Sequence, residues 1–284
     1  MFDISSYRVF VRTMLLMLLT GLLPSHVTAR SWDTFDTPVS GEAASIGSYA
    51  NGCISGAKAL PLVGEGYQVI RTQRGRYYGH PDLVNFIEQL SKTLHQSNDG
   101  YLLIGDMSMP RGGRFQSGHR SHQSGLDVDI WFRQAGGLLS DDEREQPSKL
   151  DVVQAGTFSV NQYWHQSHAD MIRQAALNPK VARIFVNPAI KHQLCSMQWQ
   201  DDSWLQRVRP WWGHSLHMHV RLRCPAGDAL CQNQAEISAG NGCDELAWWQ
   251  QQITAPKKPQ TETVQKPKAK PKPMQPQCRA MLNG

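Results

Sequence analysis

Two segments of this 284-residue chain alternate between apolar and polar residues, as half-buried β-strands do. In the first segment Leu126, Val128 and Ile130 are apolar, and Asp127 and Asp129 lie between them. Successive side chains of a strand point to opposite faces, so both carboxylates are predicted on the face opposite the apolar set. The residues just before this strand are rich in Gly and Ser and include two histidines, which predicts a loop that leads into it.

The second segment lies about ninety residues further along the chain and alternates in the same way. His217, His219 and Arg221 fall on one predicted face. The other face takes three apolar residues: Met218, Val220 and Leu222. Two such strands can bring His122, Asp129 and His219 together. Because two imidazoles, one carboxylate and an open position form a catalytic zinc site, we predict Zn²⁺ as the cofactor.

The rest of the chain predicts a mixture of helices and strands. Strands are expected at 67–72, 101–106 and 183–186, and helices at 163–177, after Asn187 and from Pro81, where apolar residues recur at helical spacing. Residues 30–66 show little periodicity and are expected to form an ordered coil. We predict an α+β fold in which a small antiparallel sheet carries the metal on one face. Helices pack outside it, and long ordered loops and disulfides complete it.

The first 29 residues have the pattern of a secretory signal peptide. Arg8 and Arg12 precede the apolar run 14–23, and Val27-Thr28-Ala29 resembles a cleavage site. This run is shorter than the roughly 20 residues that span a bilayer, so the mature protein is expected to have no membrane span. We predict a signal peptide at 1–29, a folded domain at 30–250 and a Lys/Pro-rich tail at 251–284.

The formal charge of +5 lies outside the predicted folded domain. The tail carries +6 and the signal peptide +1, which leaves −2 for residues 30–250. A near-neutral domain lacks the basic footprint of a nucleic-acid-binding protein, so we expect no nucleic-acid partner. The Lys, Pro and Gln of the tail predict a solvated spacer.

All six cysteines follow the signal peptide, and an even count in an exported protein predicts three disulfides. The sequence alone leaves about fifteen pairings open. Cys224 and Cys231 are close enough to close a small loop, and Cys53 and Cys278 could tie the two ends together. A disulfide at Cys278 would return the end of the tail to the folded domain.

The histidine and aspartate pattern resembles that of the penicillin-insensitive murein endopeptidases, within the wider group of lysostaphin-type enzymes, D-alanyl-D-alanine metallopeptidases and hedgehog domains. The shared motif is a histidine, six residues, an aspartate and a later His-x-His, here His122 to Asp129 and His217-Met218-His219. Further segments carry the resemblance over roughly residues 38 to 280: 45–47, 52–54, 78–84, 103–107, 183–191 and 208–211.

This resemblance implies a zinc metallopeptidase domain with specific site residues. His122, Asp129 and His219 would bind zinc, and His119 would be a weaker fourth ligand. His217 and His214 would flank the metal without being core ligands. The resemblance also implies three disulfide pairings: Cys53–Cys278, Cys195–Cys243 and Cys224–Cys231. It implies a periplasmic enzyme whose substrate is cross-linked peptidoglycan, cut at the D-alanyl-meso-diaminopimelyl bridge.

Hydrolysis of an amide also needs proton transfer and substrate binding. We expect His217 to act as general base and His214 to stabilise the oxyanion or donate a proton, although the two roles could be exchanged. Arg111, Arg114 and Arg221 lie near the metal motifs and could bind the carboxylates of the peptide stem.

The sequence leaves several alternatives open. The chain could be a zinc D-alanyl-D-alanine carboxypeptidase, or a zinc-bearing peptidoglycan-binding module without catalysis. Some relatives carry an additional Asp/His pair, and His165 and His168 lie in the corresponding region without matching it, so a second metal site stays open. A homodimer also stays open.

Overall fold

The computed structural model describes residues 30–98, 100–255 and 272–284. The expected signal peptide and residues 256–271 of the expected tail therefore lie outside the described residues. Residues Ser31–Gly284 form one unit. Within the described part of the chain, no helix combines the length and hydrophobicity that crossing a bilayer requires.

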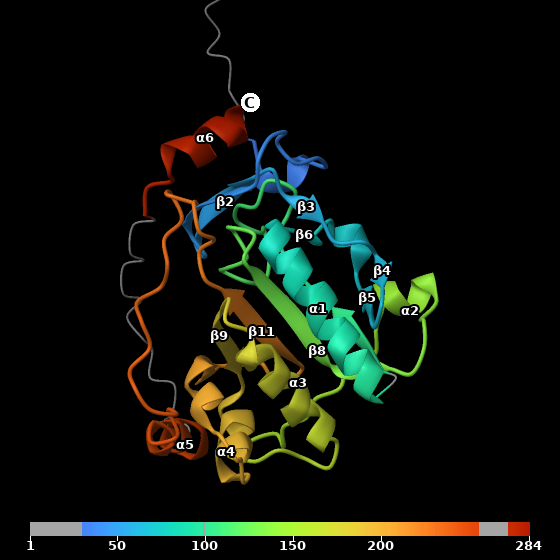
Figure 1. Cartoon of the computed structure of the whole chain (residues 1–284), viewed down its shortest axis with the longest axis vertical. Helices are drawn as coiled ribbons and strands as arrows, with labels where there is room; N and C mark the ends of the chain where they lie inside the picture. The colour runs from blue at the N-terminus through green and yellow to red at the C-terminus, as the bar shows by residue number, and fades with distance from the viewer. Residues whose placement is uncertain (1–29, 99, 256–271) are drawn as a thin grey trace, which may run out of the picture. The chain divides into compact units, whose positions relative to one another are not determined.

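A seven-stranded sheet forms the centre of this unit (Figure 1). Its strands are, in spatial order, β10 (Val208–Pro210), β9 (Val181–Val186), β11 (His217–Leu222), β8 (Asp127–Ala135), β7 (Tyr101–Ile104), β5 (Tyr67–Val69) and β4 (Val63–Gly64). The four central strands pair in antiparallel fashion. The flanking pairs β9/β10 and β5/β7 are parallel, because a helix connects the two strands of each pair.

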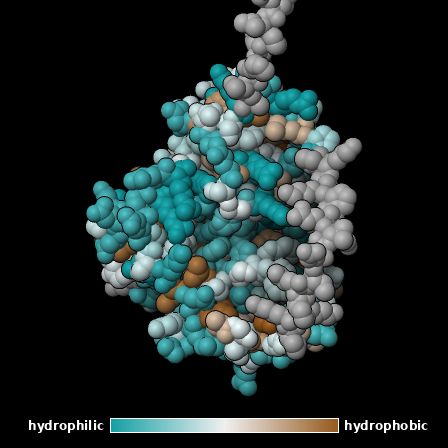
Figure 2. Space-filling model, turned by 180° about the vertical axis from the view of Figure 1, so that it is seen from behind, coloured by the Kyte–Doolittle hydropathy of each residue, from teal (hydrophilic) through white to brown (hydrophobic). Residues whose placement is uncertain are grey.

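One face of this sheet is buried under helices, of which α1 is seen in front of the sheet beside β8 in Figure 1. The helices that pack there are α1 (Pro81–Asn98), α3 (Gln166–Leu177) and α4 (Pro188–Ser196). Val128, Ile130, Met218 and Val220 point into this core and are fully buried. The alternation therefore leaves the aspartates and histidines of β8 and β11 on the opposite face. Seen from that opposite side in Figure 2, the surface is predominantly hydrophilic and has a recess near its middle.

The remaining elements lie around the sheet. A hairpin of β1 (Ala44–Ser48) and β2 (Asn51–Ser55) and a pair of β3 (Lys58–Ala59) and β6 (Tyr78–Gly79) precede α1. The other elements are the short helix α2 (Asp141–Glu145), α5 (Leu246–Thr254), α6 (Pro276–Asn283), and three 3-10 turns at Trp32–Thr34, Thr72–Arg74 and Ser203–Arg207.

The α+β class, the antiparallel pairing around the site and the presence of three disulfides are confirmed. The sheet is larger than expected, since β4 and β10 at its two edges have only two and three residues and are too short to show periodicity. The prediction of coil over 30–66 was wrong. The hairpin β1/β2 is built largely from small and polar residues, so its pairing depends on contacts with distant segments rather than on alternation.

Disulfides join segments that are distant in sequence. Cys53 of β2 pairs with Cys278 of α6, across 225 residues. Cys195 of α4 pairs with Cys243, just before α5, and Cys224 pairs with Cys231. These are the pairings that the resemblance implies. Helix α5 runs across position 250, where the sequence pattern places the start of the tail.

His168 is buried in α3, and both nitrogens of its ring contact backbone groups. Its Nδ1 accepts a hydrogen bond from the backbone N–H of His165 at 3.0 Å, and its Nε2 lies 3.1 Å from the carbonyl oxygen of Phe132. Burial, helped by the neighbouring His165, lowers the pKa of His168 to about 4. Neither His165 nor His168 belongs to a group of metal-binding side chains among the described residues.

We predict that His168 makes stability depend on pH. Its folded pKa of about 4 lies below the unfolded value of about 6.5, so the stabilisation is complete above pH 6.5 and is lost as pH falls through 4. His168→Gln should lower the urea midpoint at pH 7.5 and lose less stability than the wild type on acidification to pH 4.5. The exposed His192→Gln should follow the wild type. Equal acid sensitivity in H168Q and the wild type would contradict this role.

Candidate metal centre

Strand pairing places the aspartates and histidines opposite one another. His219 of β11 lies directly across from Asp129 of β8, and Arg221 lies directly across from Asp127. Directly opposed residues of an antiparallel pair have their Cβ atoms about 5 Å apart and on the same face. The register therefore assembles two acid–base pairs from segments that are ninety residues apart in sequence.

The loop before β8 places the other two histidines. His122 has a φ of 68°, in the left-handed region that non-glycine residues seldom adopt. Its backbone N–H donates a 2.9 Å hydrogen bond to Oδ2 of Asp127, which holds this conformation. Gly125 (φ 74°) follows, where an added Cβ would lie 2.5 Å from the side chain of Ile54. This tight packing fixes the loop against β2.

Four side chains converge on one point: His119, His122, Asp129 and His219. One ligand atom from each lies within 4.8 Å of all the others. His219 Nδ1 and His122 Nε2 lie 3.1 and 3.4 Å from Asp129 Oδ1, and His119 Nε2 lies 3.2 Å from Asp129 Oδ2. The structure therefore brings together all the ligands that the sequence suggests.

These residues fit a bound cation. His122 Nε2 and Asp129 Oδ1 are buried yet have no hydrogen-bond partner among the described residues. Buried polar atoms without partners are costly unless a further group satisfies them. Burial raises the pKa of Asp129, but His217 and His122 outweigh it and hold that pKa well below its usual value. The group therefore offers an ionised carboxylate with three imidazoles, a donor set suited to zinc.

Asp127 contacts two of the candidate ligands, His122 and His219, from the side away from Asp129. Its fully buried carboxylate accepts hydrogen bonds from the His122 backbone and from Arg221 Nε at 2.8 Å, and it faces Nε2 of His219 at 3.1 Å. Burial raises the pKa of Asp127, but the charges of Arg221 and His219 lower it below its usual range. A carboxylate on the far nitrogen of a liganding histidine fixes the ring orientation and raises its basicity.

His214 and His217 lie beside the metal group. His217 Nε2 lies 3.6 Å from Asp129 Oδ1, and the rings of His214 and His217 have centroids 5.1 Å apart. His214 Nδ1 lies 2.8 Å from the carbonyl oxygen of Trp212, so this nitrogen carries the hydrogen and Nε2 is left as an acceptor. Burial and His217 lower the pKa of His214 to about 4, and burial also lowers the pKa of His217. Both rings are therefore neutral at neutral pH.

The metal group opens into a cavity of about 330 Å³. Its lining comes from segments far apart in sequence: Ala50, His119, Arg120, Ser121, Phe185, Trp211, His214, His219, Arg221 and Gln234. Of the three arginines expected to bind substrate, Arg221 lies in this lining. Its guanidinium already holds Asp127 and donates to Gln234, and it lies over the ring of Tyr49. Arg221 therefore supports the ligands as well as facing the cavity.

Arg111 and Arg114 lie outside this lining. Arg111 donates to the carbonyl oxygens of Met281 and Thr37 and lies over the ring of Phe35. It thereby connects α6 with the N-terminal segment. Arg114 is exposed.

Comparison with known proteins identifies the family. The profile of the family described as penicillin-insensitive murein endopeptidase matches residues 45–283. Three relatives with that name come from Pectobacterium atrosepticum, Klebsiella pneumoniae and Haemophilus influenzae, at 48%, 47% and 45% identity. The alignments cover 92%, 93% and 94% of this chain and 92%, 96% and 94% of the relatives. The chain belongs to the penicillin-insensitive murein endopeptidase family.

This member of the family has one further residue at the site that the motif search missed. Asp106, just after β7, is buried and contacts Arg76 at 2.9 Å, Arg74 at 3.3 Å and His119 Nε2 at 3.8 Å. Its backbone carbonyl accepts a hydrogen bond from Asp129. The sequence shows only that Asp106 ends a predicted buried strand, and nothing in it connects this aspartate to His119.

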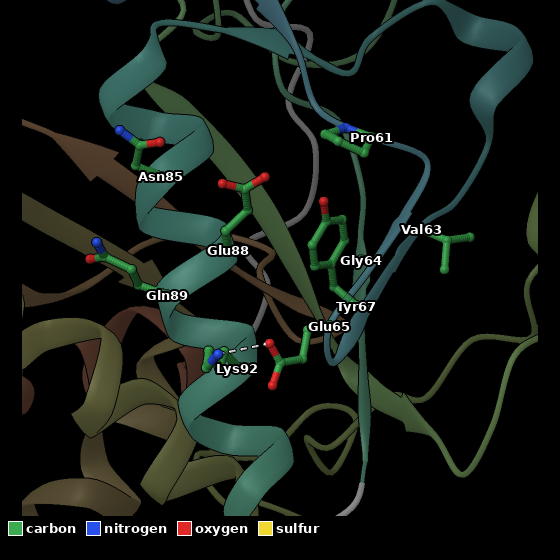
Figure 3. Close-up of a pocket in the computed structure, with 9 residues that line it drawn as sticks. All are labelled: Pro61, Val63, Gly64, Glu65, Tyr67, Asn85, Glu88, Gln89 and Lys92. Atoms are coloured by element: carbon green, nitrogen blue, oxygen red, sulfur yellow. Dashed lines mark ion pairs between the residues drawn. The ribbon is translucent and has the colours of Figure 1, made fainter.

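A second cavity, of about 350 Å³, lies between α1 and the β4/β5 hairpin (Figure 3). Its rim carries the exposed Lys92–Glu65 ion pair at 3.0 Å, and the ring of Tyr67 lies between helix and hairpin. None of its lining residues belongs to the metal group. We therefore place the site of this family member on the opposite face of the sheet.

We predict that Asp127 controls metal affinity without being a ligand. Asp127→Asn should still bind one zinc ion, with affinity lowered roughly 10- to 100-fold, because His219 loses its charged partner. Asp129→Ala removes a ligand and should abolish tight binding. Chelator competition measures both, with the exposed Asp142→Asn as control. Unchanged zinc affinity in D127N would refute the supporting role.

Proposed function

We propose that this protein is a zinc-dependent murein endopeptidase that hydrolyses the D-alanyl-meso-diaminopimelyl cross-bridge of peptidoglycan. The observation that carries the proposal is the four-residue metal group at the edge of a cavity. Two of its buried atoms, His122 Nε2 and Asp129 Oδ1, have no hydrogen-bond partner among the described residues. Family membership supports the substrate class, since the relatives are named murein endopeptidases.

His122, Asp129 and His219 would hold the metal, with His119 as the fourth and more exposed side chain. When bound, zinc supplies a Lewis acid for the scissile carbonyl and lowers the pKa of water to about 7. Asp127 keeps Nδ1 of His219 turned toward Asp129 by facing the opposite nitrogen of that ring. Asp106 holds His119 from the other side.

His217 and His214 would carry the protons. His217 is the nearer of the two to the Asp129 carboxylate, so we assign it the proton of the attacking water. His214 presents Nε2 as an acceptor at neutral pH and cannot donate a hydrogen bond to an oxyanion in that state. We therefore assign His214 to proton transfer rather than to oxyanion stabilisation: it would take over the proton that His217 removes from the water and pass it to the leaving amine.

The shape of the cavity favours an endopeptidase over a carboxypeptidase. A neighbouring cavity of about 300 Å³ shares Phe185, Trp211 and Gln234 with the metal cavity. The two cavities together extend away from the metal, as a cross-linked peptide requires, whereas removal of a terminal D-alanine needs only a closed pocket.

Insensitivity to penicillin follows from the type of chemistry. β-Lactams acylate a serine nucleophile, and the proposed reaction uses water activated at a metal site instead. We further propose that residues 1–29 direct export to the periplasm, where the substrate lies, and are then removed.

Digestion of purified, cross-linked sacculi tests the proposed function. We expect the mature protein to convert dimeric muropeptides to monomers, with activity abolished by chelator, restored by zinc and unaffected by penicillin. Mass spectrometry identifies the products. Loss of terminal D-alanine alone would instead indicate the carboxypeptidase, and zinc binding without any product would indicate a binding module.

We predict that His217→Ala and His214→Ala separate catalysis from metal binding. Each should lower kcat on a dimeric muropeptide by roughly 10²- to 10⁴-fold while zinc stoichiometry is retained. His122→Ala is the matched comparison and should lose both. If H217A and H214A lose zinc as H122A does, the assignment to proton transfer fails.

The lowered pKa values of His214 and His217 also predict the pH profile. A base acts only when unprotonated, and burial lowers the pKa of His217, the assigned base, so kcat should stay high at pH 6.5 and fall only at lower pH. Nearby metal charge would shift these pKa values further in the same direction. A pH–rate profile of the zinc-loaded enzyme whose acid limb lies at or above pH 6.5 would contradict neutral, buried imidazoles.

A further inference from the structure

The cavity adjoining the metal cavity carries charged side chains between aromatic walls. Glu236 and Glu245 contribute its acidic groups. Phe185, Trp211 and Trp249 contribute the aromatic surface, and Arg183 and Arg209 contribute the cations. Trp211 is about half exposed (52%) and its ring meets Phe185 edge to face, with centroids 5.9 Å apart. Because Phe185 and Trp211 also line the metal cavity, a ligand held at the metal can continue into this space.

The charged groups around this cavity are mostly paired. Arg209 binds Glu245, Arg223 binds Glu236 at 3.2 Å, and Arg221 holds Asp127. Arg183 differs from them. It lies on β9 directly across from Arg221, and none of the ion pairs of the described residues includes it. One of its guanidinium nitrogens, Nη2, donates to the backbone carbonyl of Ala235.

The electrostatic surroundings of Arg183 match this geometry. Burial and the neighbouring cations of Arg221 and Arg209 lower the pKa of Arg183, and Tyr49 and Glu236 oppose them less strongly. The guanidinium of Arg183 stays protonated despite the lowered pKa, since arginine does not lose its proton in proteins under ordinary conditions. A half-buried cation with cationic neighbours and no carboxylate pair is suited to an anionic ligand group.

We propose that Arg183 and the cavity adjoining the metal cavity form a subsite for a carboxylate of the peptide stem, on one side of the bond to be cut. The inference rests on the proposed function. In the proposed substrate, the carbon bonded to the scissile nitrogen carries a free carboxylate of diaminopimelate, and the stem also carries the α-carboxylate of its γ-linked glutamate. Either group can accept two hydrogen bonds from a guanidinium, and the aromatic walls would hold the intervening methylene chain. Arg183 is thus a positioning residue for the substrate.

The test combines variants of Arg183 with chemically modified substrates. Three dimeric muropeptides are compared: unmodified, amidated at the free diaminopimelate carboxylate, and amidated at the glutamate α-carboxylate. Arg183→Gln should lower kcat/KM on the unmodified dimer roughly 10- to 100-fold, mainly through KM. Arg183→Lys keeps the charge but cannot donate two parallel hydrogen bonds to one carboxylate, so its kcat/KM should lie between those of the wild type and R183Q. Lys92→Gln removes an exposed cation that is paired with Glu65 beside the cavity between α1 and the β4/β5 hairpin, and it should match the wild type.

The decisive result is a loss of discrimination. The wild type should prefer the unmodified dimer to one of the amidated dimers, and R183Q should cleave these two dimers at equal rates. The position of the amide in the disfavoured dimer identifies the carboxylate that Arg183 binds. If R183Q still discriminates as the wild type does, or if the wild type cleaves all three dimers equally, the subsite is refuted. Zinc stoichiometry and the thermal midpoint of R183Q should equal those of the wild type. Absence of cleavage of every dimer by the wild type would instead refute the proposed function.

Discussion

The buried carboxylate of Asp127 is the constraint on which the site depends. It accepts the backbone N–H of His122, which holds that residue at a positive φ, and it faces the far nitrogen of His219. Arg221 meets it with two nitrogens and supplies the compensating charge. A buried, ionised carboxylate is tolerated only when it is paired and hydrogen-bonded, so these three partners stabilise one another. Loss of any one of them would disturb the other two.

The sheet makes this arrangement rigid. β8 and β11 are neighbours at its centre, and the apolar side chains on their other face are fully buried under α1, α3 and α4. A shift of one residue in register would exchange the core face and the metal face of a strand. Hydrophobic burial on one face therefore fixes the positions of His219 and Asp129 on the other. Ligands placed on strands in this way need little reorganisation when a metal binds.

Around this rigid centre, loops and disulfides shape the cavity. The loop with His119 and His122 packs against β2, which Cys53 joins to α6. Trp211 and His214 come from the loop between β10 and β11, and Gln234 comes from the segment after the Cys224–Cys231 loop. Near the cavity, Arg209, Arg221 and Arg223 are already paired with carboxylates of this chain. A ligand in this cavity would therefore meet several cations whose charge is already compensated, which favours recognition by position over general attraction.

The sequence by itself determined the chemistry and its local geometry. The alternation around Asp129 and His219 fixed which face each side chain takes, because a strand has a period of two, and the helix from Pro81 followed from its apolar spacing. Only the tertiary structure decided which residues from other segments lie near the candidate metal group. Asp106, Phe185, Gln234 and the role of Arg221 depend on how β7, β9 and distant loops pack, and the hairpin at 44–55 has no periodicity of its own. Local patterns encode which face a residue takes, whereas long-range contacts determine its neighbours, and for that reason Arg111 looked close to the site in sequence but lies against α6 in space.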